Sequence, residues 1–100
     1  MTHFFVLDLD YVTDLDEVER HLAAHREFLH RHYSDGTFLA SGRKDPRTGG
    51  IIIARGDRAT ITGIVASDPF NRHGVARYTI TEFVPTMTAD LLAPLASDSA

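Results

Sequence analysis

The sequence predicts an α+β domain in which the elements follow the order strand, helix, strand, strand, helix, strand. Three observations support this class. Residues 3–11 and 75–84 alternate apolar and polar side chains, residues 15–32 repeat apolar side chains at helical spacing, and clusters of turn-forming residues separate the segments. This order is that of the ferredoxin-like (βαββαβ) arrangement, so we expect two helices on one face of an antiparallel four-stranded sheet.

The first strand and the first helix have the clearest patterns. Residues 3–11 place leucine and tyrosine in alternation with aspartate, which is typical of a strand with one buried face. Asp14 or Thr13 is placed to cap the following helix, and Gly36 suits the left-handed position that ends it. The helix carries an apolar stripe that consists of Leu15, Val18, Leu22, His25, Leu29 and His32.

The second half of the chain is punctuated by turn residues. Residues 37–42 and 51–54 predict two strands joined in a β-hairpin by the turn formers of 45–50. Residues 57–67 are rich in strand-favouring side chains, but Asp57 is a good helix cap, which favours a helix by a small margin. Pro69 interrupts regular structure, and a loop over 71–74 is expected before the last strand.

The sheet face opposite the two helices would be bare in a monomer. A bare apolar face favours burial against a second copy, so we expect a homodimer through the open sheet face, with packing of the dimeric α+β barrel type. Residues 86–100 form a tail in which Leu91, Leu92 and Leu95 predict an apolar helical turn. The last few residues, rich in alanine and serine, are expected to be frayed.

Composition excludes several functional classes. One hundred residues predict a single domain over 1–100, with its core in 3–85. The formal net charge is −4 with the bases scattered among acids, which disfavours nucleic-acid binding. The absence of cysteine excludes disulfides and thiolate chemistry.

No segment approaches the ~20 apolar residues of a membrane helix, and no basic signal region precedes the first strand, so we expect a cytoplasmic protein without a membrane partner.

His25 is the main candidate for chemistry because it lies at the centre of the apolar stripe, where a polar group needs a buried partner. Asp68, held extended by Pro69 beyond the second helix, is a partner that this topology brings near the first helix. The carboxylate of such a pair orients the imidazole and stabilises its protonated form, so the other ring nitrogen can move protons. The residues alone leave open a core histidine bonded to a carbonyl and an Asp68 that only forms a turn.

Other residues give weaker signals. His21 and His25 are four residues apart, a spacing that can chelate a divalent metal, but the metalloprotease pattern is absent. His30 and His32 are expected at the surface or the rim. Ser41 is a candidate pocket hydroxyl that lacks the surroundings of a catalytic nucleophile. We therefore expect no metal site.

Together these motifs resemble the YCII-related (YciI-like) proteins over about residues 4–84. The matching motifs, in the order of the family, are His25 with Phe28-Leu29, Gly36, Leu39, Ser41-Gly42, Arg47-Thr48-Gly49-Gly50, Asp68-Pro69-Phe70, Gly74, Tyr78 and Glu82-Phe83. The resemblance implies a ferredoxin-like fold, a helix over 57–67 and a dimer through sheet packing. It also implies a cleft with its His/Asp centre at His25 and Asp68 and with Ser41 nearby.

The resemblance leaves the substrate open, since most members have none assigned and a related member removes chloride from a hydroxylated aromatic intermediate. Arg43 follows Gly42 where the family usually has proline. Arg43 and Arg47 are candidate cleft residues that would favour an anionic substrate. The hypothesis is a small dimeric enzyme without a cofactor, in which His25 and Asp68 carry out elimination, isomerisation or hydrolysis. The alternative is a dimeric module that binds a small molecule or a protein without catalysis.

Overall fold

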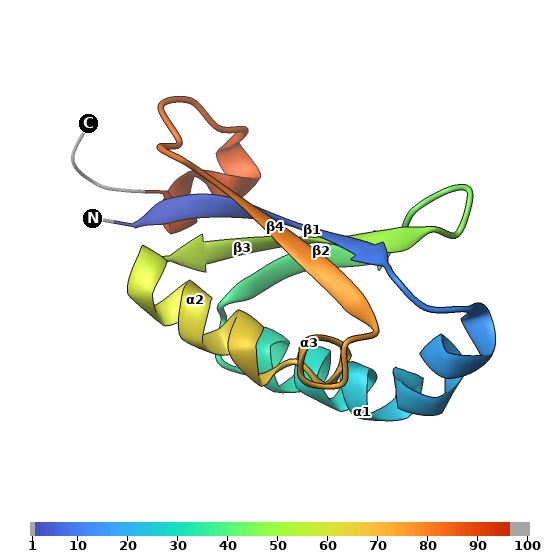
Figure 1. Cartoon of the computed structure of the whole chain (residues 1–100). Helices are drawn as coiled ribbons and strands as arrows, with labels where there is room; N and C mark the ends of the chain where they lie inside the picture. The colour runs from blue at the N-terminus through green and yellow to red at the C-terminus, as the bar shows by residue number, and fades with distance from the viewer. Residues whose placement is uncertain (1, 97–100) are drawn as a thin grey trace.

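The computed structural model describes residues 2–96 and has the element order that the sequence predicts (Figure 1). The expected fraying of the chain end concerns residues 97–100, which lie outside the described range. The elements are β1 (His3–Tyr11), α1 (Leu15–Ser34), β2 (Phe38–Arg43), β3 (Gly49–Gly56), α2 (Arg58–Ser67), the short α3 (Pro69–Arg72), β4 (Ala76–Phe83) and the 3₁₀ helix η1 (Asp90–Leu95).

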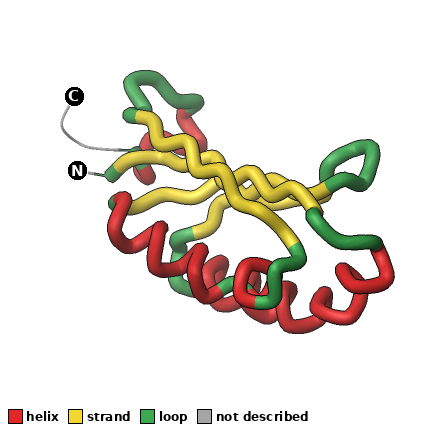
Figure 2. Tube along the Cα trace, viewed as in Figure 1, coloured by secondary structure: helices red, strands yellow, loops and turns green. Residues whose placement is uncertain are grey.

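The four strands form one antiparallel sheet in the order β2-β3-β1-β4, with all the larger helices on one of its faces (Figures 1 and 2). This is the predicted ferredoxin-like fold. The predicted turn around Leu91 is the 3₁₀ helix η1, whose side chains are not buried. No helix among residues 2–96 has the length and hydropathy needed to cross a bilayer.

Side chains cap both larger helices at their first turns. The Asp14 carboxylate accepts a hydrogen bond of 2.9 Å from the amide of Glu17, and Asp57 accepts one of 2.8 Å from the amide of Thr60. These bonds satisfy amides that have no partner inside a helix. The helix that starts at Asp57 forms despite the strand preference of its threonines and isoleucines, because it is capped and its Ile61 and Val65 are buried in the core.

The buried side of α1 is rotated from the predicted stripe. Leu15 at its first turn is 47% exposed, whereas Phe28, outside the predicted stripe, is buried together with Val18, His25 and His32. The helix thus turns toward Phe28, which contacts Phe38 on β2 with ring centroids 5.5 Å apart. Leu22 and Leu29, at the other margin of the stripe, are left half-buried.

The prediction of a loop over residues 71–74 is partly wrong, because Pro69–Arg72 forms one helical turn, α3. Asp68 caps this turn by accepting a hydrogen bond of 2.9 Å from the amide of Phe70. Pro69 fits the first helical position, where no amide hydrogen is needed. The Asp-Pro pair therefore ends one helix and starts another.

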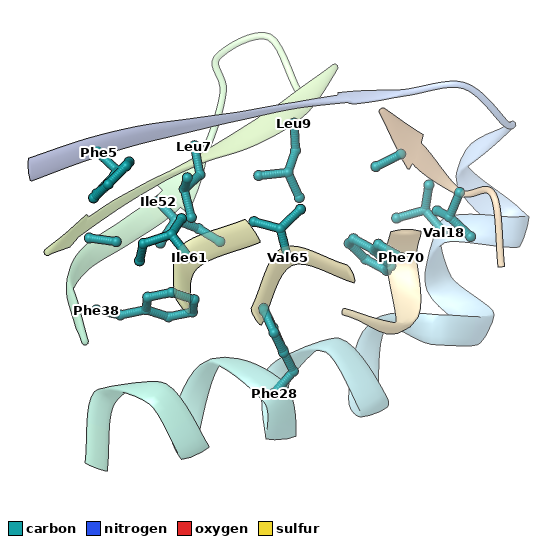
Figure 3. Packing of buried hydrophobic residues seen from close by; sticks show 13 residues of the cluster. Phe5, Leu7, Leu9, Val18, Phe28, Phe38, Ile52, Ile61, Val65 and Phe70 are labelled. Atoms are coloured by element: carbon teal, nitrogen blue, oxygen red, sulfur yellow. The ribbon is translucent and has the colours of Figure 1, made fainter. Parts of the chain in front are cut away.

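The core lies between the sheet and the helices (Figure 3). It joins alternate residues of β1 with one side of each helix, and its larger members are Phe5, Leu7, Leu9, Val18, Phe28, Phe38, Ile52, Ile61, Val65 and Phe70. Each of these side chains is at most 5% exposed. Burial of such side chains is the dominant favourable contribution to folding.

The opposite face of the sheet carries the other residues of β1 and is divided into two parts. At one end Phe4 packs edge-on against Phe83 of β4, with ring centroids 5.7 Å apart. At the other end the Lys44 ammonium lies 2.6 Å from a carboxylate oxygen of both Asp8 and Asp10. The face predicted to be apolar is therefore apolar at one end and charged at the other.

Gly49 marks a point where β3 and β1 approach too closely for a side chain. A Cβ atom at this position would lie 1.8 Å from the carbonyl oxygen of Leu9. We expect Gly49→Ala to lower the free energy of unfolding by about 3 kcal/mol or more, because backbone must move. Gly63→Ala is the control, since a Cβ there meets nothing within 4 Å and alanine favours the α2 helix by about 1 kcal/mol. Urea denaturation of both variants measures the difference, and equal stabilities would contradict the prediction.

Candidate functional site

His25 and Asp68 form a buried hydrogen-bonded pair. Nδ1 of His25, on the buried side of α1, lies 2.8 Å from Oδ1 of Asp68, at the joint between α2 and α3. The imidazole is stacked on the Phe70 ring with centroids 4.0 Å apart and an interplanar angle of 5°. Because residue 25 is only 8% exposed, its ring has one well-defined orientation.

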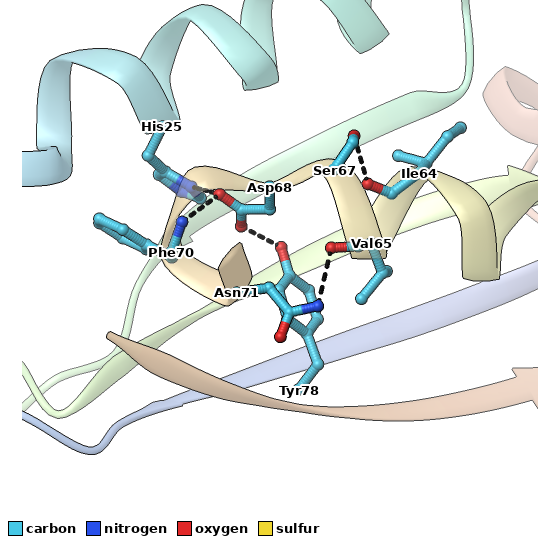
Figure 4. Close-up of polar contacts among 8 residues, drawn as sticks. All are labelled: His25, Ile64, Val65, Ser67, Asp68, Phe70, Asn71 and Tyr78. Carbon is cyan, nitrogen blue, oxygen red and sulfur yellow. Dashed lines mark hydrogen bonds and ion pairs between the residues drawn. The ribbon is translucent and has the colours of Figure 1, made fainter. Parts of the chain in front are cut away.

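Asp68 is fully buried and accepts hydrogen bonds from three donors (Figure 4). Oδ1 accepts from His25 and from the Phe70 amide, and Oδ2 accepts from the Tyr78 hydroxyl. Burial raises the pKa of the Tyr78 hydroxyl, and the charge and hydrogen bond of Asp68 raise it further. Tyr78 therefore stays a donor, and a buried carboxylate with three donors is well satisfied.

The hydrogen bond to Asp68 assigns the imidazole tautomer. An ionised carboxylate only accepts, so the proton of neutral His25 lies on Nδ1 and the lone pair lies on Nε2. Nε2 has no hydrogen-bond partner within residues 2–96 and is not one of the sealed, unpaired polar atoms of that range. The basic nitrogen thus remains available on the side of the ring away from Asp68.

His25 borders a pocket of about 290 Å³ between α1 and the β2–β3 hairpin. Its wall is mainly apolar, with His25 as an ionisable group, and consists of Leu9, Tyr11, Leu22, His25, Arg26, Leu29, Ser41, Gly42, Arg43, Gly49, Gly50, Ile51, Ile52 and Phe70. The half-buried leucines of α1, Leu22 and Leu29, belong to this wall. An apolar hollow with a few polar groups is the usual form of a small-molecule site.

A family model of the YCII-related domain matches residues 3–84. The chain belongs to the YCII-related family. This agrees with the resemblance that its motifs show, and the matched range runs from the start of β1 to the residue after β4. Both His25 and Asp68 lie inside it.

Among solved structures, this YCII-related chain is similar to 5-chloro-2-hydroxyhydroquinone dehydrochlorinase (TftG) from Burkholderia phenoliruptrix AC1100, determined in complex with 2,5-dihydroxybenzoquinone. The two chains share 19% sequence identity with a TM-score of 0.66, and the similarity covers 83% of this chain and 93% of that one. At this identity the likeness shows a common fold. No curated protein matches this chain in sequence.

Of the other predicted site residues, two border the pocket and one does not. Ser41 lies in its wall, and its hydroxyl accepts a hydrogen bond of 2.5 Å from Tyr33. Arg43 also borders it. The Arg47 guanidinium lies outside the wall and donates a hydrogen bond of 2.7 Å to Glu19. That bond, together with Tyr11, raises the pKa of Arg47.

Arg26 is a pocket residue that sequence reasoning missed. It borders the pocket beside His25, and neither it nor Arg43 forms an ion pair within residues 2–96. Its position directly after His25 on a helix places it about 100° around the axis, at the margin of the buried side. Its position next to His25 was the signal in the sequence that could have identified it. However, an arginine outside the apolar stripe is ordinarily expected to be exposed.

The remaining histidines of α1 have separate partners. His21 lies 3.2 Å from Glu17 and is stacked on His73 with centroids 4.4 Å apart, so it does not share a site with His25. His32 was expected at the rim, but it is buried against Phe28 and Phe38 and bonds Asp35 at 2.9 Å. Within residues 2–96 no three His, Cys, Asp or Glu side chains gather as metal ligands would.

Proposed function

We propose that this YCII-related protein is a small enzyme in which His25, oriented by Asp68, transfers a proton on a small molecule bound in the pocket. The observation that carries the proposal is the 2.8 Å bond between His25 and Asp68 beside a pocket of about 290 Å³. A buried histidine with a purely structural role does not require a pocket beside its ring. Small-molecule sites span ~300–1,000 Å³, so this pocket suits a compact ligand.

The proposed chemistry is general acid and base catalysis without a cofactor. Nε2 of His25 accepts a proton from a C–H or O–H group of the substrate, and the ring becomes an imidazolium. The Asp68 carboxylate stabilises this cation through Nδ1, and the same proton then returns to the product or to a leaving group. Elimination, isomerisation and hydrolysis all use such a step.

The similarity to TftG supports testing elimination first. That protein is named a dehydrochlorinase, and its structure holds 2,5-dihydroxybenzoquinone. Hydroxylated six-membered rings are therefore reasonable first compounds for this chain, although a shared fold does not by itself transfer an activity. The apolar wall of the pocket is compatible with a flat ring against Leu22 and Phe70.

We further propose that Ser41, Arg43 and Arg47 bind the substrate and that Arg26 joins them. Arg26 and Arg43 border the pocket from α1 and β2 without ion pairs in the described part of the chain, so they are available to a negative group. Arg47 stands next to Tyr11, which lines the pocket, but Glu19 holds its guanidinium. An anionic substrate would pair with charges that have no ion-pair partner among residues 2–96.

Substitution of His25 tests the catalytic proposal. A panel of chlorinated and hydroxylated hydroquinones and quinones is offered to the protein, and chloride release and ultraviolet spectra are followed. For any compound converted, we expect His25→Gln to lower kcat by at least ~100-fold, because the proton acceptor is lost. His30→Gln is the matched control, since His30 is exposed on the same helix. Unchanged turnover by a folded His25→Gln variant rules out the proposal, and tight binding without turnover by the parent favours the non-catalytic module.

A pair of ring compounds of equal shape tests the arginines. We expect Arg26→Gln and Arg43→Gln each to weaken the binding of 4-hydroxybenzoate about tenfold, because each removes a charge-assisted hydrogen bond. Binding of neutral 4-hydroxybenzamide should not change. Arg47→Gln should have a smaller effect, since its guanidinium is already bonded to Glu19. Titration calorimetry measures the affinities, and equal losses for both compounds would mean that the arginines do not select charge.

We propose a homodimer through the open sheet face. Its support is the apolar part of that face, where Phe83 is 43% exposed and Ile53, opposite Val6 in the sheet, is only half-buried. We expect sedimentation velocity to show a dimer and Ile53→Glu to produce a monomer, because a buried unpaired charge is costly. Thr62→Glu on the exposed side of α2 is the control and should remain dimeric. A monomeric parent protein at micromolar concentration contradicts this assembly.

A further inference from the structure

We propose that Tyr78 is a positioning residue of the His25–Asp68 pair. Its hydroxyl holds the second oxygen of Asp68 and takes up part of the carboxylate charge, so that His25 rests as a neutral imidazole with a free lone pair on Nε2. The inference rests on the proposed function, because it concerns how the same pair is kept ready to accept a proton.

The geometry brings three elements together at one carboxylate. His25 comes from α1, Asp68 from the joint between α2 and α3, and Tyr78 from β4 (Figure 4). Oδ1 is occupied by His25 at 2.8 Å and by the Phe70 amide at 2.9 Å, so Tyr78 is the donor to Oδ2. With both oxygens held, the carboxylate plane is fixed and so is the direction of the imidazole.

The charge of Asp68 has consequences for His25. Asp68 is fully buried, and water therefore does little to stabilise its charge. If Oδ2 lost its donor, the carboxylate would be balanced mainly by His25, which favours the doubly protonated imidazolium. An imidazolium has no lone pair on Nε2 and cannot act as a base. A neutral donor on Oδ2 reduces that tendency without adding a charge.

Other ionisable groups around the pair do not replace Tyr78. Arg26 on α1 and Arg43 on β2 border the same pocket, and Tyr11 on β1 completes the ionisable groups of its wall apart from His25. The positive charges of the two arginines disfavour the protonated form of His25. However, both arginines border the pocket and neither bonds the Asp68 carboxylate. Within residues 2–96, Tyr78 is the side chain other than His25 that bonds the Asp68 carboxylate.

The test compares two tyrosine variants by NMR and needs no substrate. Imidazole ¹⁵N and ¹H resonances of His25, assigned by their loss in His25→Gln, are followed against pH. In Tyr78→Phe we expect the imidazolium of His25 to persist to higher pH, with the titration midpoint raised by about one pH unit, because Asp68 loses a charge-assisted hydrogen bond. Tyr33→Phe is the matched control, since it removes a hydrogen bond to Ser41 outside this network, and its midpoint should equal that of the parent.

A second measurement covers the case in which Tyr78→Phe does not fold. In a Tyr11→Phe, Tyr33→Phe background, 3-fluorotyrosine is incorporated at Tyr78, where it is a stronger donor of nearly the same size. The midpoint of His25 should then fall below that of the same background with ordinary tyrosine. An unchanged midpoint in a folded Tyr78→Phe variant, or on fluorination, overturns the proposal and leaves Tyr78 as a structural hydrogen bond. If the catalytic proposal itself is wrong, a different experiment shows it, because turnover by the folded His25→Gln variant is then unchanged.

Discussion

The structure depends on one buried carboxylate. Asp68 caps α3 through the Phe70 amide, orients His25 of α1 and receives the hydroxyl of Tyr78 on β4. A buried charge without partners is strongly unfavourable, so the three donors must be in place together for the helices to pack on this side of the sheet. The folding of the helical layer and the arrangement of the candidate site therefore share the same set of hydrogen bonds.

The pocket follows from two further constraints in the fold. On one side, α1 turns its buried surface toward Phe28 and leaves Leu22 and Leu29 as a partly open wall. On the other side, the hairpin presents glycines, and Gly49 lets its backbone approach Leu9 where no side chain would fit. The cavity lies between these leucines and the glycine backbone of the hairpin at Gly42, Gly49 and Gly50, which has no side chains to fill it.

Much of this was predictable from periodicity and turn residues. The alternation in β1, the cap at Asp14 and the Asp-Pro break all act locally, so they led to the correct fold. For the pairing of His25 with Asp68, which are 43 residues apart, the residues gave only a candidate, and the resemblance to the YCII-related family was needed to favour it. Arg26 and Tyr78 were not recognised as site residues, because an arginine beside a stripe and a tyrosine in a strand also fit surface and core roles. The role of Arg26 depends on how α1 is rotated about its axis, and the role of Tyr78 depends on the distance from β4 to Asp68. The spacing of residues along the chain gives neither the rotation nor the distance.

The stacking of His25 on Phe70 also limits how a ligand can reach the ring. With the two rings 4.0 Å apart and nearly parallel, one face of the imidazole is covered by carbon. Under the proposed function, a reacting group has to approach in the imidazole plane, along the lone pair of Nε2, with the rest of the molecule against the pocket wall. If the pocket wall also fixes which face of a flat substrate meets Nε2, proton transfer to or from a carbon of that substrate has a single stereochemical sense.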